Sequence, residues 1–192
     1  MSKRIALFSA AALGALALTA TVVAPVSAQD KMKSEMSGEK TVMVGGAAMF
    51  PSKNIVQNAV NSKDHTTLVA AVKAAGLVDT LEGKGPFTVF APTNAAFGKL
   101  PAGTVDTLVK PENKATLTKI LTYHVVPGKL EASDLTDGKK LKTVQGEELT
   151  VKRSGDTVMI IDSKGGSSTV TIPNVNQSNG VIHVVDTVLM PS

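Results

Sequence analysis

Cysteine and tryptophan are absent from this 192-residue sequence, and its aromatic residues are five phenylalanines and one tyrosine. Without cysteine the chain has no disulfide, no thiolate metal site, no thiol nucleophile and no cysteine for lipid attachment. Hydrophobic residues nevertheless make up 43% of the chain. Stability must therefore come from the burial of aliphatic side chains, mainly Val, Leu, Ile and Ala.

Short motifs of common catalytic sites are also missing. The sequence contains no Gly-x-Ser-x-Gly nucleophile elbow, no His-x-x-x-His pair and no glycine-rich phosphate loop. His183 and Asp186 are three residues apart, which places their side chains on opposite faces of an alternating strand. We therefore expect no catalytic residues, and we expect that the protein is not an enzyme.

The N-terminus carries a long hydrophobic run, residues 5–23, which has no charge and follows Lys3 and Arg4. This order, with the small residues VSA at positions 26–28 before a polar segment, is typical of a signal peptide. A run of about 19 apolar residues could also span a bilayer as an anchor, but the cleavage-like end favours a signal peptide. We predict cleavage after Ala28, which removes residues 1–28. The mature protein is then secreted, extracellular or periplasmic, with no transmembrane segment.

Removal of the signal peptide lowers the formal net charge from +4 to +2, because Lys3 and Arg4 leave with it. The mature chain is therefore almost neutral. It also lacks a cluster of Lys and Arg interleaved with aromatic residues, which is the usual feature of a nucleic-acid-binding surface. We expect no nucleic acid among its partners.

The mature chain divides into a short leader and one domain. Residues 29–49 mix Lys, Ser, Glu, Met and Gly without a sustained period, which predicts a flexible lead-in. Residues 50–192 are enough for a single domain with a sizeable core. We expect this domain to be a monomer.

The first half of the domain has the apolar spacing of helices. Asn54 or Ser52 is placed to cap a helix that begins near Ile55. A second apolar stripe, residues 68–75, ends at Gly76, which suits a left-handed helix cap. These patterns predict two helices, followed by a short turn of helix at Leu77, Val78 and Leu81, before the first strand.

Residues 87–90 alternate as a strand, after which the chain changes direction at a proline. Pro92 disfavours helix for the residue before it, and Thr93 or Asn94 can cap the helix that follows. Pro111 then opens another helix, whose apolar face includes His124. The joint after the strand is thus set by local chemistry.

From residue 140 onward the apolar spacing changes to a period of two, with turn signals at residues 145–146, 154–156 and 164–166. The dipeptide Asn179-Gly180 predicts a tight turn before a last strand over residues 181–189. A helix-rich first half followed by a strand-rich second half predicts the α+β class.

Three segments resemble the fasciclin (FAS1) family. They are residues 88–97 (TVFAPTNAAF), 123–128 (YHVVPG) and 179–189 (NGVIHVVDTVL), which are similar in order and spacing to its first conserved block, its tyrosine–histidine block and its second conserved block. The resemblance extends over residues 54–191, nearly all of the mature chain. It implies the FAS1 fold, a wedge-shaped two-sheet β-sandwich with helices packed along one side.

The resemblance also implies candidate binding residues. The tyrosine–histidine segment of some animal members is tied to integrin binding, which makes Tyr123 and His124 candidates. An adhesion-linked Pro-Asp-Ile segment of the family aligns with Pro173, Asn174 and Val175, where Asn174 replaces the acid that an integrin engages through its metal ion. The residue types equally suit structural roles: a core histidine bonded to backbone groups, and a buried tyrosine ring with a partnered hydroxyl.

We therefore expect a non-enzymatic fasciclin-type interaction module that binds a cell-surface or matrix protein or polysaccharide, in adhesion or in envelope or matrix association. The alternative is a small-ligand or metal carrier with an apolar cleft near His124 or His183, two residues that could approach each other and hold a metal. His65, next to Asp64, is expected to be solvated. No cofactor and no resident metal site are predicted.

Overall fold

The computed structural model describes residues 40–192, so the predicted signal peptide and most of the predicted lead-in lie outside the described residues. Within this range no helix is long and apolar enough to cross a lipid bilayer. The elements, in chain order, are β1 Val42–Val44, β2 Ala47–Met49, α2 Ile55–Ala59, η1 Lys63–His65, α3 Thr66–Ala75, α4 Val78–Glu82, β3 Phe87–Pro92, α5 Asn94–Gly98, α6 Thr104–Leu108, η2 Pro111–Asn113, α7 Lys114–Tyr123, β4 Val125–Pro127, β5 Lys140–Lys142, β6 Glu148–Ser154, β7 Thr157–Ile161, β8 Ser167–Gln177 and β9 Gly180–Val185.

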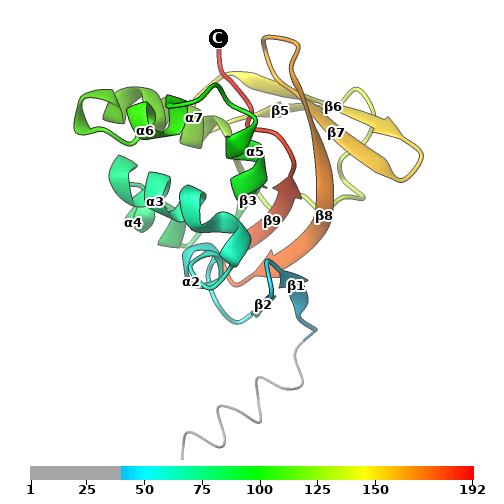
Figure 1. Cartoon of the computed structure of the whole chain (residues 1–192). Helices are drawn as coiled ribbons and strands as arrows, with labels where there is room; N and C mark the ends of the chain where they lie inside the picture. The colour runs from blue at the N-terminus through cyan, green and yellow to red at the C-terminus, as the bar shows by residue number, and fades with distance from the viewer. Residues whose placement is uncertain (1–39) are drawn as a thin grey trace, which may run out of the picture.

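A seven-stranded sheet, in the order β4-β3-β9-β8-β7-β6-β5, forms the frame of the domain. Its neighbouring strands are antiparallel except for β3 and β9, which are parallel. The long strand β8 pairs with β7 at one end and with β9 at the other, so it joins two halves of a wedge. Figure 1 shows the helices gathered beside the β3–β9 half, away from β5, β6 and β7. The predicted α+β class, with helices along one side of a two-part wedge, is confirmed.

Two hydrophobic cores lie on opposite faces of β3 and β9. Alternate residues of β3 enter them: Val89 and Ala91 face the helices, whereas Phe90 enters the interior of the wedge. The helix-side core also contains Leu68 and Leu117 from the helices. A single strand thus couples the packing of the two cores.

The joint between β3 and α5 forms as the sequence predicts. Thr93 follows the last residue of β3 with an extended backbone, and its Oγ1 accepts a hydrogen bond from Ala96 N at 3.2 Å. In the same way, Asn54 caps α2 in a capping box with Gln57, and Gly76 ends α3 with a φ of 72°. Each signal acts within one turn of chain, so the sequence alone is sufficient to predict it.

Residues 42–49 contradict the prediction of a flexible lead-in. They form the β1–β2 hairpin, whose two turn residues, Gly45 and Gly46, have φ of 58° and 74°, as a two-residue hairpin turn requires. Val44 and Met49 are buried in the helix-side core, at 2% and 3% exposure. The Gly-Gly pair between apolar residues is a hairpin signal. The flanking strands have only three residues each, which is too short to show an alternating pattern in a segment of mixed composition.

The turn before β9 lies one residue earlier than predicted. Gln177 pairs with Gly180, so the loop is formed by Ser178 and Asn179. Gly180 is needed for a different reason: a Cβ there would overlap the carbonyl oxygen of Phe87 on the neighbouring strand β3. Glycine therefore allows the close approach of two backbones, a second use that this residue type has in sheets.

Asn179 acts through its side chain. Its Oδ1 accepts a hydrogen bond from Ile55 N at 3.1 Å, at the start of α2. Its Nδ2 donates to the carbonyl oxygens of Leu81 and Gly83, at 2.6 and 3.0 Å, at the end of α4. One buried amide thus satisfies the free backbone groups of two helix ends and fixes both helices to the sheet.

Replacing Gly180 with Ala is expected to lower the free energy of unfolding by roughly 1–3 kcal/mol, because the added methyl must force β3 and β9 apart. Gly98→Ala is the matched control, since a Cβ at Gly98 meets no atom within 4 Å and Ala favours the end of helix α5. Urea unfolding of the two variants measures the difference. Equal stability of both would contradict the close-approach role.

Candidate functional site

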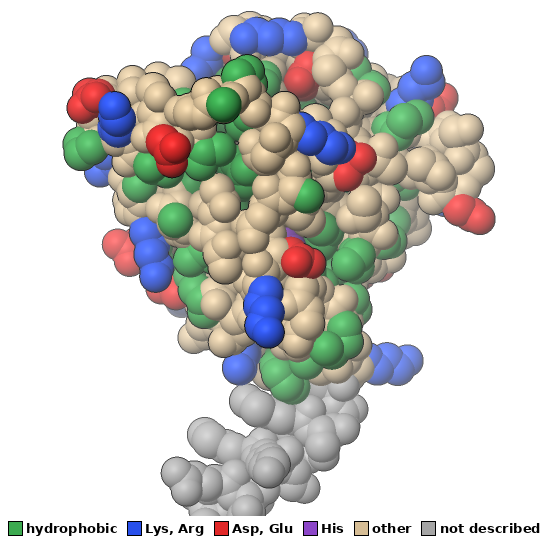
Figure 2. Space-filling view, viewed as in Figure 1, with side chains coloured by type: hydrophobic (Ala, Val, Ile, Leu, Met, Phe, Trp, Pro, Cys, Tyr) green, Lys and Arg blue, Asp and Glu red, His purple; other side chains and the backbone are tan. Residues whose placement is uncertain are grey.

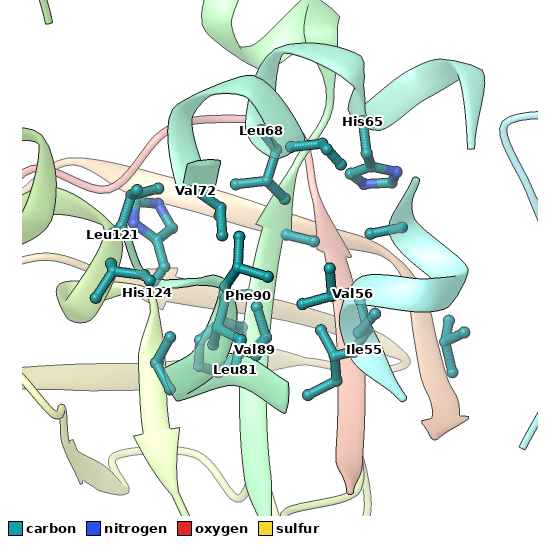
Figure 3. Close-up of a pocket in the computed structure, with 18 of the residues that line it drawn as sticks. Ile55, Val56, His65, Leu68, Val72, Leu81, Val89, Phe90, Leu121 and His124 are labelled. Carbon is teal, nitrogen blue, oxygen red and sulfur yellow. The ribbon is translucent and has the colours of Figure 1, made fainter. Parts of the chain in front are cut away.

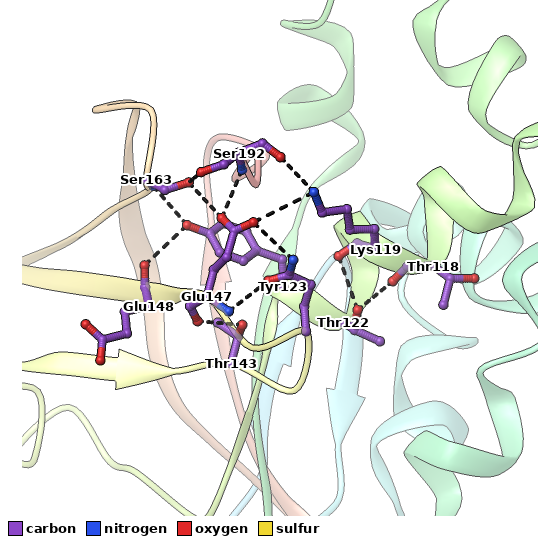
Figure 4. Close-up of polar contacts among 10 residues, drawn as sticks. Thr118, Lys119, Thr122, Tyr123, Thr143, Glu147, Glu148, Ser163 and Ser192 are labelled. Atoms are coloured by element: carbon purple, nitrogen blue, oxygen red, sulfur yellow. Dashed lines mark hydrogen bonds and ion pairs between the residues drawn. The ribbon is translucent and has the colours of Figure 1, made fainter.

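Tyr123 ends α7, and its side chain is fully buried in the wedge core. Its hydroxyl oxygen accepts a hydrogen bond from Ser163 N at 2.9 Å and donates one to the Glu148 carbonyl oxygen at 3.4 Å. Figure 4 shows the ring next to a polar cluster that includes Glu147, Ser163 and Ser192. The predicted buried ring with a partnered hydroxyl is confirmed.

Glu147 is the centre of this polar cluster. Its carboxylate accepts hydrogen bonds from Ser192 N at 2.9 Å and from the Ser163 hydroxyl at 3.0 Å, and it lies 3.7 Å from Lys119 Nζ. The Ser192 N–H, assisted by the side chains of Ser163 and Gln145, lowers the pKa of Glu147 to about 2. The cluster joins α7, the loop after β7 and residue 192 around the hydroxyl end of Tyr123.

Tyr123→Phe is expected to lower the free energy of unfolding by about 1–2 kcal/mol, because Ser163 N loses its acceptor in a part-buried site. Ser133→Ala is the control, since it removes an exposed hydroxyl and is expected to change stability by less than about 0.5 kcal/mol. Thermal unfolding of both proteins is the measurement. A Tyr123→Phe protein as stable as the control variant would show that the hydroxyl bond contributes nothing.

His124 follows Tyr123 at the junction of α7 and β4, where its exposure is 2%. Nδ1 donates to the Ile120 carbonyl oxygen at 2.8 Å and Nε2 accepts from Leu189 N at 3.0 Å, which places the proton on Nδ1. Burial lowers the pKa of His124 to about 4, against the opposing effects of the Ile120 carbonyl and the Asp162 carboxylate. His124 is thus a neutral core histidine that links α7 to the chain after β9, as one of its two interpretations predicts.

His183 of β9 is fully buried and stacks on Phe90, with ring centroids 5.7 Å apart. Nε2 donates to the Leu130 carbonyl oxygen at 2.8 Å, and Nδ1 accepts from Asn174 N at 3.4 Å. Burial lowers the pKa of His183 as well. The ring therefore holds the loop after β4 and a bend in β8 against the central strands.

A metal shared by His124 and His183 would need a free nitrogen on each ring. All four ring nitrogens are hydrogen-bonded to backbone groups, and the two rings hold different parts of the chain. Within residues 40–192, no group of three or more His, Asp or Glu side chains is arranged to hold a metal ion. The geometry therefore gives the metal-carrier alternative no site at these two residues.

Asn174 and Val175 lie where β8 changes its register with β9, between Ile172 and Val175. Asn174 has a φ of 56°, and its Oδ1 accepts a hydrogen bond from Ala132 N at 2.7 Å. Val175 is in the helix-side core, at 1% exposure. The segment is a β-bulge whose side chains fasten the fold, and Asn174 is the partly exposed member of the pair.

The four predicted binding residues do not form one surface. Tyr123 enters the wedge core and Asn174 bonds to the loop after β4, whereas His124 and Val175 line the same cavity on the helix side. In the described conformation a macromolecular partner has no direct access to Tyr123, His124 or Val175. A binding role for these residues stays a prediction.

The cavity lined by His124 and Val175 is a narrow slot of about 50 Å³ between the helices and the β3–β9 half of the sheet, here called the slot. Helices α2, α3 and α4 contribute apolar side chains to one wall, and β3 and β9 contribute to the other. Figure 3 shows the rings of His65 and His124 at opposite ends, with aliphatic side chains such as Ile55, Val72 and Leu81 between them.

A void of this size is unusual in a protein core, where spaces larger than a water molecule are few. At roughly 24 cal/mol per Å³, leaving it empty costs about 1 kcal/mol. Because its walls are apolar, water gains little by entering. The predicted cleft near His124 is therefore present, whereas His183 does not line it.

His65 contradicts the expectation of a solvated side chain, because its exposure is only 3%. The β1–β2 hairpin covers this region so closely that a Cβ on Gly45 would overlap the Ser62 hydroxyl. That hydroxyl lies 2.9 Å from His65 Nδ1, whereas Nε2 has no hydrogen-bond partner among residues 40–192. Burial lowers the pKa of His65, against the nearby Ala91 carbonyl and Asp64 carboxylate. Because the hairpin was not predicted, the burial of His65 was not predicted either.

Comparison with known proteins identifies relatives along most of the chain. A profile of the Fasciclin domain family matches residues 63–191, about two thirds of the sequence. Protein sll1483 of Synechocystis sp. is 50% identical over 153 residues, which cover 80% of this chain and 82% of the relative. Immunogenic protein MPB70 of Mycobacterium bovis is 36% identical over 195 residues, which cover 97% and 96%. Cell surface glycolipoprotein MPB83 of the same species is 40% identical over 153 residues, which cover 77% and 64%.

A solved structure shares the fold at lower identity. It is a FAS1 domain pair from the insect cell adhesion molecule Fasciclin I, which matches with a TM-score of 0.66 at 20% identity. The match covers 73% of this chain and 52% of the pair, so the chain spans about half the length of that protein. At this identity the likeness establishes the fold alone. The family profile and the relatives together show that this chain belongs to the Fasciclin domain family.

Proposed function

We propose that the protein is an exported interaction module that binds a cell-surface or matrix protein or polysaccharide and catalyses no reaction. The observation that carries this proposal is how its polar side chains are used. His124, His183 and Tyr123 are buried, and their ring nitrogens and hydroxyl group form hydrogen bonds with backbone groups. Groups that are fixed in this way stabilise the fold, and they cannot reach a substrate.

The relatives support a place at the cell surface. MPB83 is described as a cell surface glycolipoprotein, and Fasciclin I is described as a cell adhesion molecule. Those words apply to the relatives themselves. Together with the predicted signal peptide of this chain, they favour export and adhesion or envelope association here.

The surface suits recognition by mixed contacts. Figure 2 shows Lys, Arg, Asp and Glu side chains scattered over one face, without a large patch of one sign. Three large hydrophobic side chains are exposed within residues 40–192, namely Met43, Val60 and Val144, at 59%, 48% and 44%. We therefore expect a partner to be held by combined polar and apolar contacts, and its binding to depend only weakly on salt.

Affinity capture tests this proposal. The protein lacking residues 1–28 is immobilised and exposed to the envelope extract and culture medium of its own cells, with the heat-denatured protein as the control. We expect the folded protein alone to retain a protein or glycan that then binds in a saturable direct titration. The proposal is wrong if no macromolecule binds and the purified protein shows turnover that a single histidine replacement abolishes.

The slot favours a second candidate function, that of a carrier for a small apolar ligand. An apolar void that costs stability when empty gains stability when an apolar group fills it. Native mass spectrometry of the protein purified from its own host is the first test. A lipid or pigment that copurifies at one molecule per chain would support the carrier, and a bare protein that binds no apolar compound would exclude it.

A further inference from the structure

We infer that the slot binds the tail of a single-chain monocarboxylate, with the carboxylate paired to Lys73 at the rim of the slot. This inference rests on the second candidate function and names the class of ligand. Three features of the slot lead to it: its volume, its opening and its charge.

The volume fits the end of one hydrocarbon chain. A water molecule needs roughly 10–15 Å³ of such a cavity, so a slot of about 50 Å³ has room for roughly three to five groups of that size. A methylene group is comparable in size to a water molecule. Because the walls are apolar, a polar group placed inside would lose its hydrogen bonds to water. The inner part of the ligand is therefore a short run of methylene groups ending in a methyl.

The partial exposure of some lining residues points to an entrance to the slot between α2 and the α3–α4 pair. Several of its lining residues are partly exposed, namely Val56 and Ala59 of α2, Val69 of α3, and Leu77 and Val78 at the start of α4. We therefore expect a chain end to enter between these helices. The rest of the ligand stays at the rim, where water remains available.

Lys73 gives the rim its charge. It is the single charged side chain among the described residues that line the slot. Its ammonium group makes no hydrogen bond or ion pair within residues 40–192. Lysine commonly lays its hydrocarbon stem along apolar surface and keeps its charge in water. A carboxylate at the end of the bound chain meets that charge, whereas a second carboxylate at the other end would be buried unpaired.

Neither histidine at the ends of the slot supplies a positive charge that would compete with Lys73 for the carboxylate. His124 has both ring nitrogens bonded to the backbone. Burial lowers the pKa of both His65 and His124, so both rings are neutral at pH 7. The positive charge at the slot therefore belongs to Lys73.

The test is a titration of the protein lacking residues 1–28 with butanoate, hexanoate, octanoate and decanoate, followed by the methyl NMR signals of Ile55, Val72 and Leu81. We expect affinity to rise roughly three- to fourfold per methylene group until the slot is full and then to level off. Octanoate should bind more tightly than 1-octanol. Lys73→Gln should reduce the affinity for octanoate to that for 1-octanol, whereas Lys152→Gln, an exposed lysine on β6, should leave it unchanged.

A second pair of variants tests whether the slot is the site. Ala59→Leu places three more carbons at the slot wall and is expected to abolish binding in a protein whose circular dichroism is unchanged. If the Ala59→Leu protein does not fold, Val69→Leu is used in its place. Equal binding of octanoate and 1-octanol, insensitive to Lys73→Gln, would overturn the carboxylate assignment and leave the carrier function standing. Absence of all chain binding, or octanoate binding that the folded slot variant leaves unchanged, would overturn both the carboxylate assignment and the carrier function.

Discussion

Replacing Phe90 with Ala is expected to lower the free energy of unfolding by about 3–5 kcal/mol. Phe90 has no exposed surface, and it lies in the wedge core with its ring stacked on His183. Its backbone N–H also donates to the His124 carbonyl oxygen at 2.9 Å, which holds β3 next to the end of α7. Loss of the ring leaves a cavity at the centre of the wedge and removes the packing partner of His183. Most domains of this size are stable by 5–15 kcal/mol, so the variant is expected to be close to unfolding.

Phe90→Leu is the matched control, because it keeps most of the apolar volume and is expected to cost less than about 1.5 kcal/mol. Urea unfolding followed by circular dichroism gives both values. The midpoint should fall in the order wild type, Phe90→Leu, Phe90→Ala, with little change in the slope of the transition. A Phe90→Ala protein as stable as Phe90→Leu would show that this ring is not central to the core.

Acid is expected to destabilise the protein by about 3 kcal/mol between pH 6.5 and pH 4 through His124 alone. The ordinary pKa of histidine is 6.5, and burial lowers that of His124 to about 4. Between these values the unfolded chain binds a proton that the folded chain excludes. The free energy of unfolding is therefore highest above pH 6.5 and falls as the pH falls to 4. Burial lowers the pKa of His65 and His183 in the same direction, so both add to the loss.

The measurement is urea unfolding at several pH values from 8 to 4, on wild type and on His124→Gln. The variant is expected to be less stable at pH 8, because the bonds of the ring to Ile120 and Leu189 are lost or distorted. Between pH 8 and pH 4, the free energy of unfolding of His124→Gln should fall by about 3 kcal/mol less than that of wild type. Glu147 contributes only below about pH 4.5, because its pKa is lowered from 4.5 to about 2, and its contribution cancels because wild type and His124→Gln both contain it. Parallel stability curves for the two proteins would refute the assignment to His124.

The sequence predicts best where a residue acts on its immediate neighbours. Thr93 caps α5, Asn54 caps α2 and Gly76 ends α3 because each decides the hydrogen bonds or backbone angles of the next few residues. The α+β class follows in the same way from the change of apolar period. The structural interpretations of Tyr123 and His124 also succeed, because a lone aromatic residue and a histidine on an apolar stripe need buried partners.

The failures concern contacts between segments far apart in the chain. Gly180 is required by Phe87, 93 residues earlier, so the pattern Asn179-Gly180 predicts a turn at both residues although only Asn179 lies in the loop. His65 is buried by a hairpin whose strands have three residues each, too short for a clear period. The slot exists because the side chains of several elements do not completely fill the space between the helices and the sheet. No sequence pattern shows how much of that space stays unfilled.

Histidine NMR over pH 3.5–8 tests most directly whether the tyrosine–histidine segment holds the fold together. Long-range proton–nitrogen spectra identify which nitrogen of each ring carries the proton. We expect His124 to stay neutral, with its proton on Nδ1, down to a pH of about 4, and His183 to carry its proton on Nε2. A His124 signal that titrates near pH 6.5 while the protein remains folded would mean that the ring is open to solvent and free to meet a partner.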